Sequence, residues 1–241
     1  MNTAVHFGRF ELAVIFSLMS LPLHGGVIST FTGIDPGVGP GGAHINSQTA
    51  ANSFATTVGS ALGGSINFEN MSVGTGVPLS FGGGSLTATN AGGPLFAQVQ
   101  SGGSASLGFN TTPGGTNFFQ VNQDLATQPT VITFNFADPI SAFGAYISGL
   151  GTSAGSLRVW FDDGQLESLP VEGNASGGVL FFGFLSDAKT SAVHLQLDTV
   201  GGIVDDGIGI DDVVFTTPEP GSIGLFGVAA AMYAFSRFKR K

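Results

Sequence analysis

Apolar and polar residues alternate in three segments of the chain, which is the pattern of a β-strand with one buried face. The segments are Thr130–Phe136, Ser156–Phe161 and Ala192–Asp198. Each has an apolar residue at every second position, and successive side chains of a strand point to opposite faces. We therefore predict three antiparallel strands that pack one face on a core and expose the other to water.

Shorter segments of similar character, separated by glycine-rich turns, predict further strands. They are Gly64–Asn70, Ser85–Asn90, Leu95–Gln100, Ser104–Phe109, Asn117–Asn122, Ala142–Ser148, Val179–Leu185 and Gly207–Phe215. The turn Asp162-Asp163-Gly164 is typical of a hairpin tip. About ten short strands with regularly spaced turns predict a mainly β domain over residues 64–217, a two-sheet antiparallel β-sandwich of jelly-roll type.

One segment, Ile45–Leu62, follows a helical period instead. Its apolar residues recur every four positions, at Ala50, Phe54, Val58 and Leu62. This spacing places them on one side of an α-helix, which Asn46 or Ser47 would cap and Gly63-Gly64 would end. Residues 26–63 are therefore expected to hold a glycine-rich loop and this short helix.

The N-terminal region predicts export. Leu12–Leu23 is an apolar run of twelve residues after a weakly basic start that Arg9 closes. This length suits the core of a signal peptide and is too short for a membrane-spanning helix. A buried amphipathic helix is the alternative, but the run lacks a polar face. We predict a signal peptide over residues 1–25, cleaved near Leu23-His24-Gly25.

The C-terminal region combines three elements in a fixed order. Pro218-Glu219-Pro220 comes first, and no residue from Gly221 to Phe235 is charged. A basic cluster follows, made of Arg237, Lys239, Arg240 and Lys241. Prolines keep a helix from running back into the preceding strand, and a basic cluster resists translocation. We predict a transmembrane helix over residues 221–236 that holds a precursor in the inner membrane, with its C-terminus in the cytoplasm.

This order resembles the PEP-CTERM sorting signal of exported bacterial proteins. In that family an exosortase, a membrane-embedded cysteine protease, recognises the Pro-Glu-Pro region and releases or transfers the protein. The resemblance implies that Pro218, Glu219 and Pro220 form the recognition motif. It also implies that Arg237 begins the basic stop.

The alternative for the same segment is a permanent tail anchor with an accidental pair of prolines. A helix of the fifteen uncharged residues is only about 22 Å long, against a hydrocarbon core of about 30 Å. A transient tether that precedes delivery to the cell surface or the exterior fits this length better than a permanent anchor.

Several segments within residues 45–215 resemble a β-sandwich domain that is common among PEP-CTERM proteins. They are Ala50–Phe54, Ile66–Glu69, Phe143–Gly151, Leu180–Phe184 and Asp205–Phe215. The resemblance implies a β-sandwich for the exported part. It implies no activity, because none is settled for that domain.

Composition and charge narrow the partners of the exported part. Cysteine is absent, which removes disulfides, thiolate metal ligands and thiol nucleophiles. Between Gly26 and Thr217, Arg158 and Lys189 are the only basic residues against fourteen acidic ones, a net charge of −12. Nucleic acid is excluded as a partner, since no basic patch could neutralise its phosphates. An acidic surface suits divalent cations and solubility among polysaccharides.

The densest acidic cluster is Asp205–Asp212, with four carboxylates in eight residues. Such carboxylates repel one another unless solvent, protons or a cation neutralise them, and calcium prefers hard oxygen ligands. The chain order also resembles that of calcium-bearing carbohydrate-binding jelly rolls. There, a glutamate near the first strand and an aspartate on the last strand share one structural ion, and Glu69 and Asp211 match these places.

We take Glu69, Asp206, Asp211 and Asp212 as candidate ligands of a structural calcium ion. The alternative is that Asp205 and Asp206 form an exposed turn and that Asp211 or Asp212 binds nearby backbone amides.

Catalysis finds little support in the sequence. After signal cleavage, His44 lies in a Gly-Pro-rich loop and His194 lies on the polar face of a strand. A Ser-His-Asp site around His194 would rest on coincidence, because serines are abundant. We predict a non-catalytic surface or extracellular-matrix protein associated with exopolysaccharide, in which Trp160 and Tyr146 contact sugar unless they belong to the core. The alternative is a secreted polysaccharide-active enzyme that the same tail tethers transiently.

Overall fold

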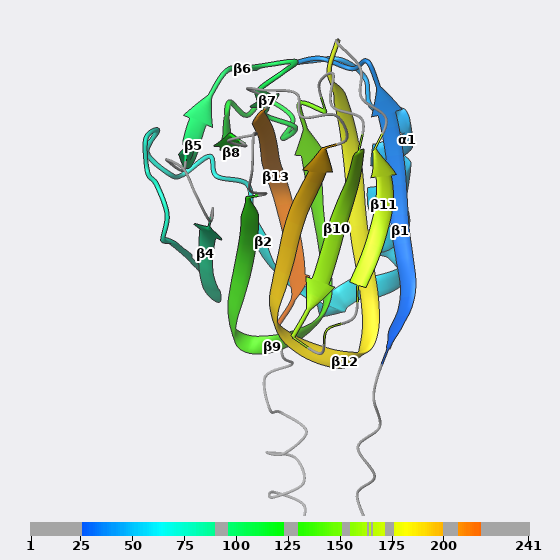
Figure 1. The fold of residues 1–241 in the computed structure, drawn as a ribbon. Coiled ribbons are helices and arrows are strands. Elements are labelled where there is room, and N and C mark those ends of the chain that lie inside the picture. Colours follow the sequence, from blue (N-terminus) through cyan, green and yellow to red (C-terminus); the bar gives the residue numbers. More distant parts are fainter. Residues whose placement is uncertain are drawn as a thin grey trace, which may run out of the picture.

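Two long antiparallel strands, β9 (Val131–Ser148) and β12 (Gly178–Thr199), run through the whole fold. Their pairing shifts register between Leu185 and Ala192. Irregularities of this kind bend strands, and Figure 1 shows both strands turning at one end of the molecule. Each strand therefore contributes one half to each of two sheets.

The structure is a computed structural model that describes residues 26–89, 96–122, 130–150, 155–162, 164, 166–171, 176–199 and 207–217. One sheet, here called the β10 sheet, consists of β11 (Leu166–Val171), β10 (Gly155–Phe161), β12, β9, β4 (Gly84–Thr89) and β3 (Leu79–Phe81). The other, here called the β13 sheet, consists of β1 (Val27–Pro36), β12, β9, β13 (Gly207–Thr216), β8 (Asn117–Asn122) and β5 (Phe96–Ser101), and β2 (Leu62–Ile66) pairs with the end of β13. The short strands β6 (Gly103–Ser104) and β7 (Gly108–Phe109) form a separate pair. All these pairings are antiparallel.

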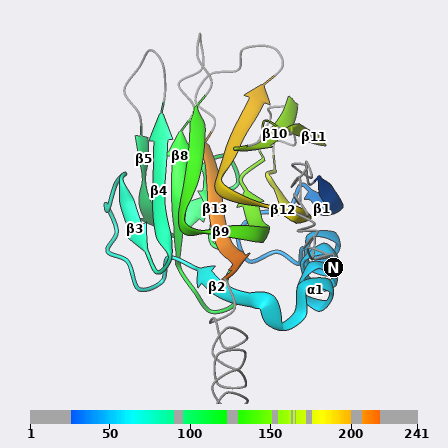
Figure 2. The ribbon, with the colours of Figure 1, turned by 90° about the horizontal axis from the view of Figure 1, so that it is seen from below.

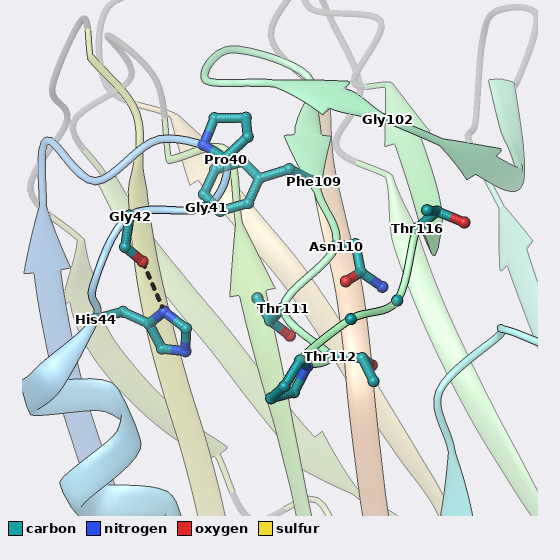
Figure 3. Close-up of a pocket in the computed structure, with 13 residues that line it drawn as sticks. Pro40, Gly41, Gly42, His44, Gly102, Phe109, Asn110, Thr111, Thr112 and Thr116 are labelled. Carbon is teal, nitrogen blue, oxygen red and sulfur yellow. Dashed lines mark hydrogen bonds between the residues drawn. The ribbon is translucent and has the colours of Figure 1, made fainter.

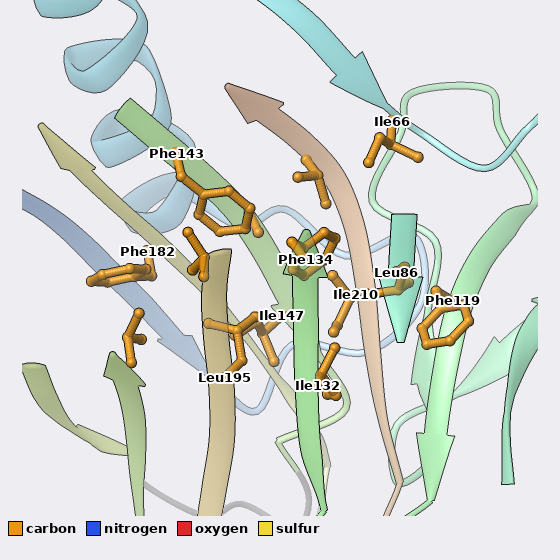
Figure 4. Close-up of a cluster of buried hydrophobic side chains, with 14 of the residues drawn as sticks. Ile66, Leu86, Phe119, Ile132, Phe134, Phe143, Ile147, Phe182, Leu195 and Ile210 are labelled. Carbon is orange, nitrogen blue, oxygen red and sulfur yellow. The ribbon is translucent and has the colours of Figure 1, made fainter. Parts of the chain in front are cut away.

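The main hydrophobic core lies between the two sheets (Figure 4). Phe134 and Leu195 come from the β10 sheet, and Phe143 and Ile210 come from the β13 sheet. The alternation in the sequence predicts which side chains face inwards, and this is confirmed for the side chains whose burial is described, although Gln196 on the predicted outer face is buried as well. The buried positions include Ile132, Phe134, Phe136, Leu157, Val159, Phe161, Val193 and Leu195. The antiparallel β-sandwich with one short helix is thus the observed architecture.

A smaller core lies between the outer face of the β13 sheet and α1 (Ile45–Val58). Phe54 of the helix is fully buried and packs against Phe181, with ring centroids 5.8 Å apart. Beneath it, Gly144 of β9 pairs directly with Gly183 of β12. A Cβ atom at Gly183 would lie 2.8 Å from the Phe54 ring, so the glycine pair forms a notch that lets the helix approach. Figure 2 shows α1 on one side of the sandwich and β10 and β11 on the opposite side.

The N-terminus of α1 is capped from a neighbouring strand. The sequence had predicted Asn46 or Ser47 as the cap, but both lie inside the helix. The carboxylate of Asp35 in β1 accepts the N–H of Asn46 at 3.0 Å and that of Ser47 at 2.8 Å. Asp35 thus satisfies two of the N–H groups that a helix leaves unpaired. The cap prediction was wrong because the capping group is supplied across a loop.

Other boundaries also differ from the sequence expectations. Residues 26–63 were expected to be a loop and a helix, but Val27–Pro36 forms β1 and pairs with β12. The helix ends at Val58, and Leu62 already begins β2. β9 and β12 each join two segments that were predicted as separate strands, because the chain continues through each bend without a turn.

Both terminal segments lie outside the described residues. These are the predicted signal peptide of residues 1–25 and the predicted sorting segment of residues 218–241, with its helix at 221–236. In the described ranges, no helix is both long enough and apolar enough to cross a membrane. Export and sorting therefore stay predictions.

Candidate functional site

An open cavity of about 400 Å³ lies over the β13 sheet, at the N-terminal end of α1 (Figure 3). One wall is the loop between β1 and α1, and the facing wall is the loop between β7 and β8, here called the 110–116 loop. The lining residues are Pro40, Gly41, Gly42, His44, Gly102, Phe109, Asn110, Thr111, Thr112, Pro113, Gly114, Gly115 and Thr116. Threonine hydroxyls, an asparagine amide and backbone groups are the polar part of the lining of this cavity, here called the loop pocket, and His44 and Phe109 are its two aromatic residues.

Two adjacent aspartates of β13 hold one end of the 110–116 loop. Asp211 Oδ2 accepts the backbone N–H groups of Thr111 at 2.7 Å and Thr112 at 3.1 Å. The Thr112 hydroxyl donates to Asp212 Oδ1 at 2.6 Å, and the Thr111 hydroxyl donates to Asp212 Oδ2 at 3.1 Å. Hydrogen bonds to ionised acceptors are stronger than those between neutral groups, so the aspartates fix the threonine backbone and side chains together.

Glu69, in the turn after β2, binds both ends of the same loop. Its Oε1 accepts the side-chain amide of Asn110 at 2.6 Å and the backbone N–H groups of Thr116 at 2.9 Å and Asn117 at 3.0 Å. A Cβ atom at Gly115 would lie 2.2 Å from Glu69 Oε1, so a larger residue there would displace this carboxylate from the loop. Glu69 and the two aspartates therefore act on one structure, the wall of the loop pocket.

Asp211 is fully buried, and only one of its oxygens is satisfied. Oδ1 has no hydrogen-bond partner. Burial and the adjacent charge of Asp212 raise the pKa of Asp211 to about 7, against the opposing effect of the N–H groups from the loop. A proton or a cation at Oδ1 would relieve this unfavourable burial of charge.

The side of the loop pocket nearest α1 is aromatic. His44 contacts Tyr146 edge to face, with ring centroids 5.6 Å apart, and Tyr146 packs in the same way on Phe181 at 5.1 Å. Tyr146 lies directly beside Asp211 in the β9–β13 pairing. Burial, with smaller effects from the charges of Asp212 and Asp35, raises the pKa of Tyr146 to about 12, so its hydroxyl stays protonated. Tyr146, predicted as a sugar contact, thus supports the His44 side of the pocket.

The candidate calcium ligands meet only in part. Glu69, Asp211 and Asp212 all bind the 110–116 loop, but their satisfied oxygens accept N–H and O–H groups of the protein. Asp206 lies outside the described residues. Within the described part of the chain, no three acidic or histidine side chains form a group that could hold a metal ion. A calcium ion shared by Glu69 and Asp211 therefore stays a prediction.

The other candidate residue, Trp160, lies away from the loop pocket on the outer face of the β10 sheet, between the buried Val159 and Phe161. It stacks on His194 of the neighbouring strand. Asp162 follows β10 and accepts the N–H groups of Ser191 at 2.7 Å and Ala192 at 3.1 Å.

The sequence had not singled out Asn110, Thr111 and Thr112, because they stand in a glycine-rich break without periodicity. Only the pairing of Thr-Thr with a distant Asp-Asp could have hinted at them, and one chain alone does not reveal such a pair.

No protein-family model matches this chain, and comparison with curated proteins gives no match either. Among solved structures, the K2 cleaved adhesin domain of Lys-gingipain is 14% identical, with a TM-score of 0.48 over 64% of this chain and 98% of that domain. The family 11 carbohydrate-binding module of a Clostridium thermocellum cellulase is 7% identical, with a TM-score of 0.36 over 64% and 95%. A CBM51 module from Clostridium perfringens, in complex with methyl-galactose, is 12% identical, with a TM-score of 0.36 over 64% and 100%. At these values the similarity carries no conclusion about what this chain binds.

Proposed function

We propose that this chain is an exported, non-catalytic surface or matrix protein that binds exopolysaccharide through the loop pocket. The observation that carries the proposal is the wall of the pocket, where three carboxylates fix a loop of hydroxyl and amide groups. Binding sites for small polar ligands are commonly cavities of this size with a few oriented polar groups. A wall fixed before binding saves the cost of ordering it later.

The chemistry of the lining suits a sugar. Sugar hydroxyls can donate to threonine oxygens and can pair with backbone groups, and the ring of His44 offers apolar contact for one face of a sugar ring. The three carboxylates beside the pocket, together with the net charge of −12, disfavour acidic sugars. The favoured ligand is therefore an uncharged saccharide.

The arrangement of the acids favours binding over hydrolysis. A glycosidase needs two carboxyl groups that flank the scissile bond and act on it. Near the loop pocket, oxygens of Glu69, Asp211 and Asp212 accept hydrogen bonds from the 110–116 loop. These acids therefore have a structural role that explains their presence without catalysis.

Delivery forms the second part of the proposal. The signal peptide and the Pro218-Glu219-Pro220 motif with its basic end support export, transient residence in the inner membrane and processing by an exosortase. The sandwich would then reach the cell surface or the exterior.

The binding proposal is tested by a glycan array and by affinity electrophoresis in the exopolysaccharide of the producing cell. His44→Ala removes one aromatic wall and Thr116→Trp fills the loop pocket, and each is expected to weaken binding at least about ten-fold. Thr56→Ala, on the exposed face of α1 outside the pocket, is the matched control and should bind like the native protein. Unchanged binding by both pocket variants, or shortening of the saccharide during incubation, would refute the proposal.

A further inference from the structure

A row of side chains crosses four strands on the outer face of the β10 sheet. Trp160 of β10 pairs with His194 of β12, His194 pairs with Thr133 of β9, and Thr133 pairs with Thr87 of β4. All four side chains are partly exposed. Neighbouring strands are about 4.8 Å apart, so the row is about 14 Å long. A row of this length suits a stretch of extended polymer better than one small molecule.

The aromatic end of this row is held in place by its neighbours. The rings of Trp160 and His194 are stacked, with centroids 5.1 Å apart and planes 13° apart. His194 Nδ1 forms a hydrogen bond with the Thr133 hydroxyl at 2.9 Å. A partly exposed tryptophan that is fixed in orientation loses little conformational entropy when a flat ligand stacks on it.

The row itself carries no net charge at neutral pH. Burial lowers the pKa of His194 below that of a free histidine, against a smaller opposing effect of Asp162. The other members are a tryptophan and two threonines. Arg158 lies two positions before Trp160 on the same face of β10. The carboxylate of Asp162 accepts the backbone N–H groups of Ser191 and Ala192 in β12. The surface therefore offers aromatic and hydroxyl contacts rather than an ionic site.

We propose that Trp160, His194, Thr133 and Thr87 form a second saccharide-binding surface, for an extended uncharged polysaccharide chain. It lies on the face of the sandwich opposite the loop pocket, because the pocket is on the outer side of the β13 sheet. Aromatic stacking supplies the binding energy and the threonine hydroxyls supply hydrogen bonds to the sugar. Together with the loop pocket, and resting on its proposed function, this surface makes the protein bivalent, so that one molecule can join two polysaccharide chains.

Trp160 is the only tryptophan of the chain, so its fluorescence reports on this surface directly. Titration of the full chain with neutral oligosaccharides is expected to shift Trp160 emission in the native protein and equally in His44→Ala. Trp160→Ala should lose at least about ten-fold in retardation on neutral polysaccharide gels when measured in the His44→Ala background. Trp160→Phe, which keeps a ring, should lose less. The melting temperature of each variant verifies that it is folded.

The outcomes separate this surface from the loop pocket. The proposal is overturned if Trp160 emission stays constant on titration, or if Trp160→Ala in the His44→Ala background is retarded as much as His44→Ala alone. A larger emission shift with acidic than with neutral saccharides also overturns it. Loss of the Trp160 response in His44→Ala would show that there is one site and not two. Bivalence is tested by light scattering of mixtures with a neutral polysaccharide. The native protein should cluster the polymer, whereas each single-site variant should bind it without clustering.

Discussion

At the scale of single residues, Asp211 gives the protein a distinctive dependence on pH. Its pKa is raised to about 7 in the folded state, whereas that of an unfolded aspartate is near 3.8. Between about pH 4 and pH 7 the folded chain therefore holds a proton that the unfolded chain has lost. The contribution of Asp211 to stability is fully present below about pH 4 and is lost as the pH rises through about 7.

We predict that Asp211→Asn is more stable than the native protein at pH 8, by on the order of 2 kcal/mol, and that the difference shrinks towards pH 4. Asparagine can still accept from Thr111 and Thr112 through its one oxygen, and it carries no charge that burial and Asp212 would disfavour. Urea unfolding at several pH values, in the presence of a chelator, measures the difference. Subtracting the unfolding free energy of the native protein from that of the variant cancels the contributions of titrating groups that both proteins share, such as His194.

Asp138→Asn is the control, because Asp138 is exposed. Its stability should equal that of the native protein at every pH. A native protein that exceeds Asp211→Asn in stability at pH 8 without calcium would contradict the assignment. If calcium neutralises Asp211, as the sequence predicts, calcium should raise the denaturation midpoint of the native protein at pH 8 and leave that of the variant unchanged.

Some functional residues of the loop pocket could be predicted from the sequence, and their hydrogen-bond partners could not. Asp211 and Asp212 could be selected in advance, because clustered acids in a chain with few charges demand an explanation, and Glu69 was selected through the resemblance to calcium-bearing jelly rolls. The partners of the two aspartates, Thr111 and Thr112, could not be selected, because they are about one hundred positions away in the sequence. Asp35 likewise caps a helix from another strand. Local rules for caps and turns do not contain such tertiary hydrogen bonds.

At the scale of elements, the seating of α1 depends on the absence of side chains beneath it. Gly144 and Gly183 face each other across β9 and β12, and Phe54 fills the space above them. The helical period in the sequence predicted Phe54 as a core residue. It could not predict the notch, because the two glycines come from strands that pair only in the folded protein.

We predict that Gly183→Ala destabilises the protein by about 1–3 kcal/mol, since overpacking forces the Phe54 ring and the helix to move. Gly82→Ala is a matched control, because a Cβ atom there meets nothing within 4 Å. It should change the unfolding free energy by less than about 0.5 kcal/mol. Chemical denaturation measures both, and equal effects of the two changes would show that the notch is unimportant.

At the scale of the whole molecule, the strand patterns predicted the class of fold but not its continuity. Alternation identified both halves of β9 and both halves of β12 as separate strands. Their joining through a bend was not predictable, since Ala137, Asp138 and Pro139 interrupt the apolar pattern as a turn would. The two sheets therefore share covalently continuous strands and are expected to unfold together.

The delivery of the molecule is tested by the intact mass of the native extracellular protein. If the protein is processed at the sorting motif, its mass should be that of a polypeptide that begins near Gly26 and ends between Pro218 and Gly221. Changing Pro218, Glu219 and Pro220 to alanine should retain the precursor in the membrane fraction. A full-length mass in that fraction for the native protein would support the permanent anchor instead.

The described ends of the chain lie together at the bends of the two long strands. Gly26 contacts Ser186 and Asp187, and the hydroxyl of Thr216 accepts the N–H of Ser141. The loop pocket borders the other end, where β1 finishes and β12 begins (Figure 1). While the proposed sorting segment after Thr217 still holds the precursor, the pocket would face away from the lipid. The protein could then bind matrix polysaccharide while it is still in the membrane, and cleavage of the sorting segment would release the protein with the polysaccharide already bound.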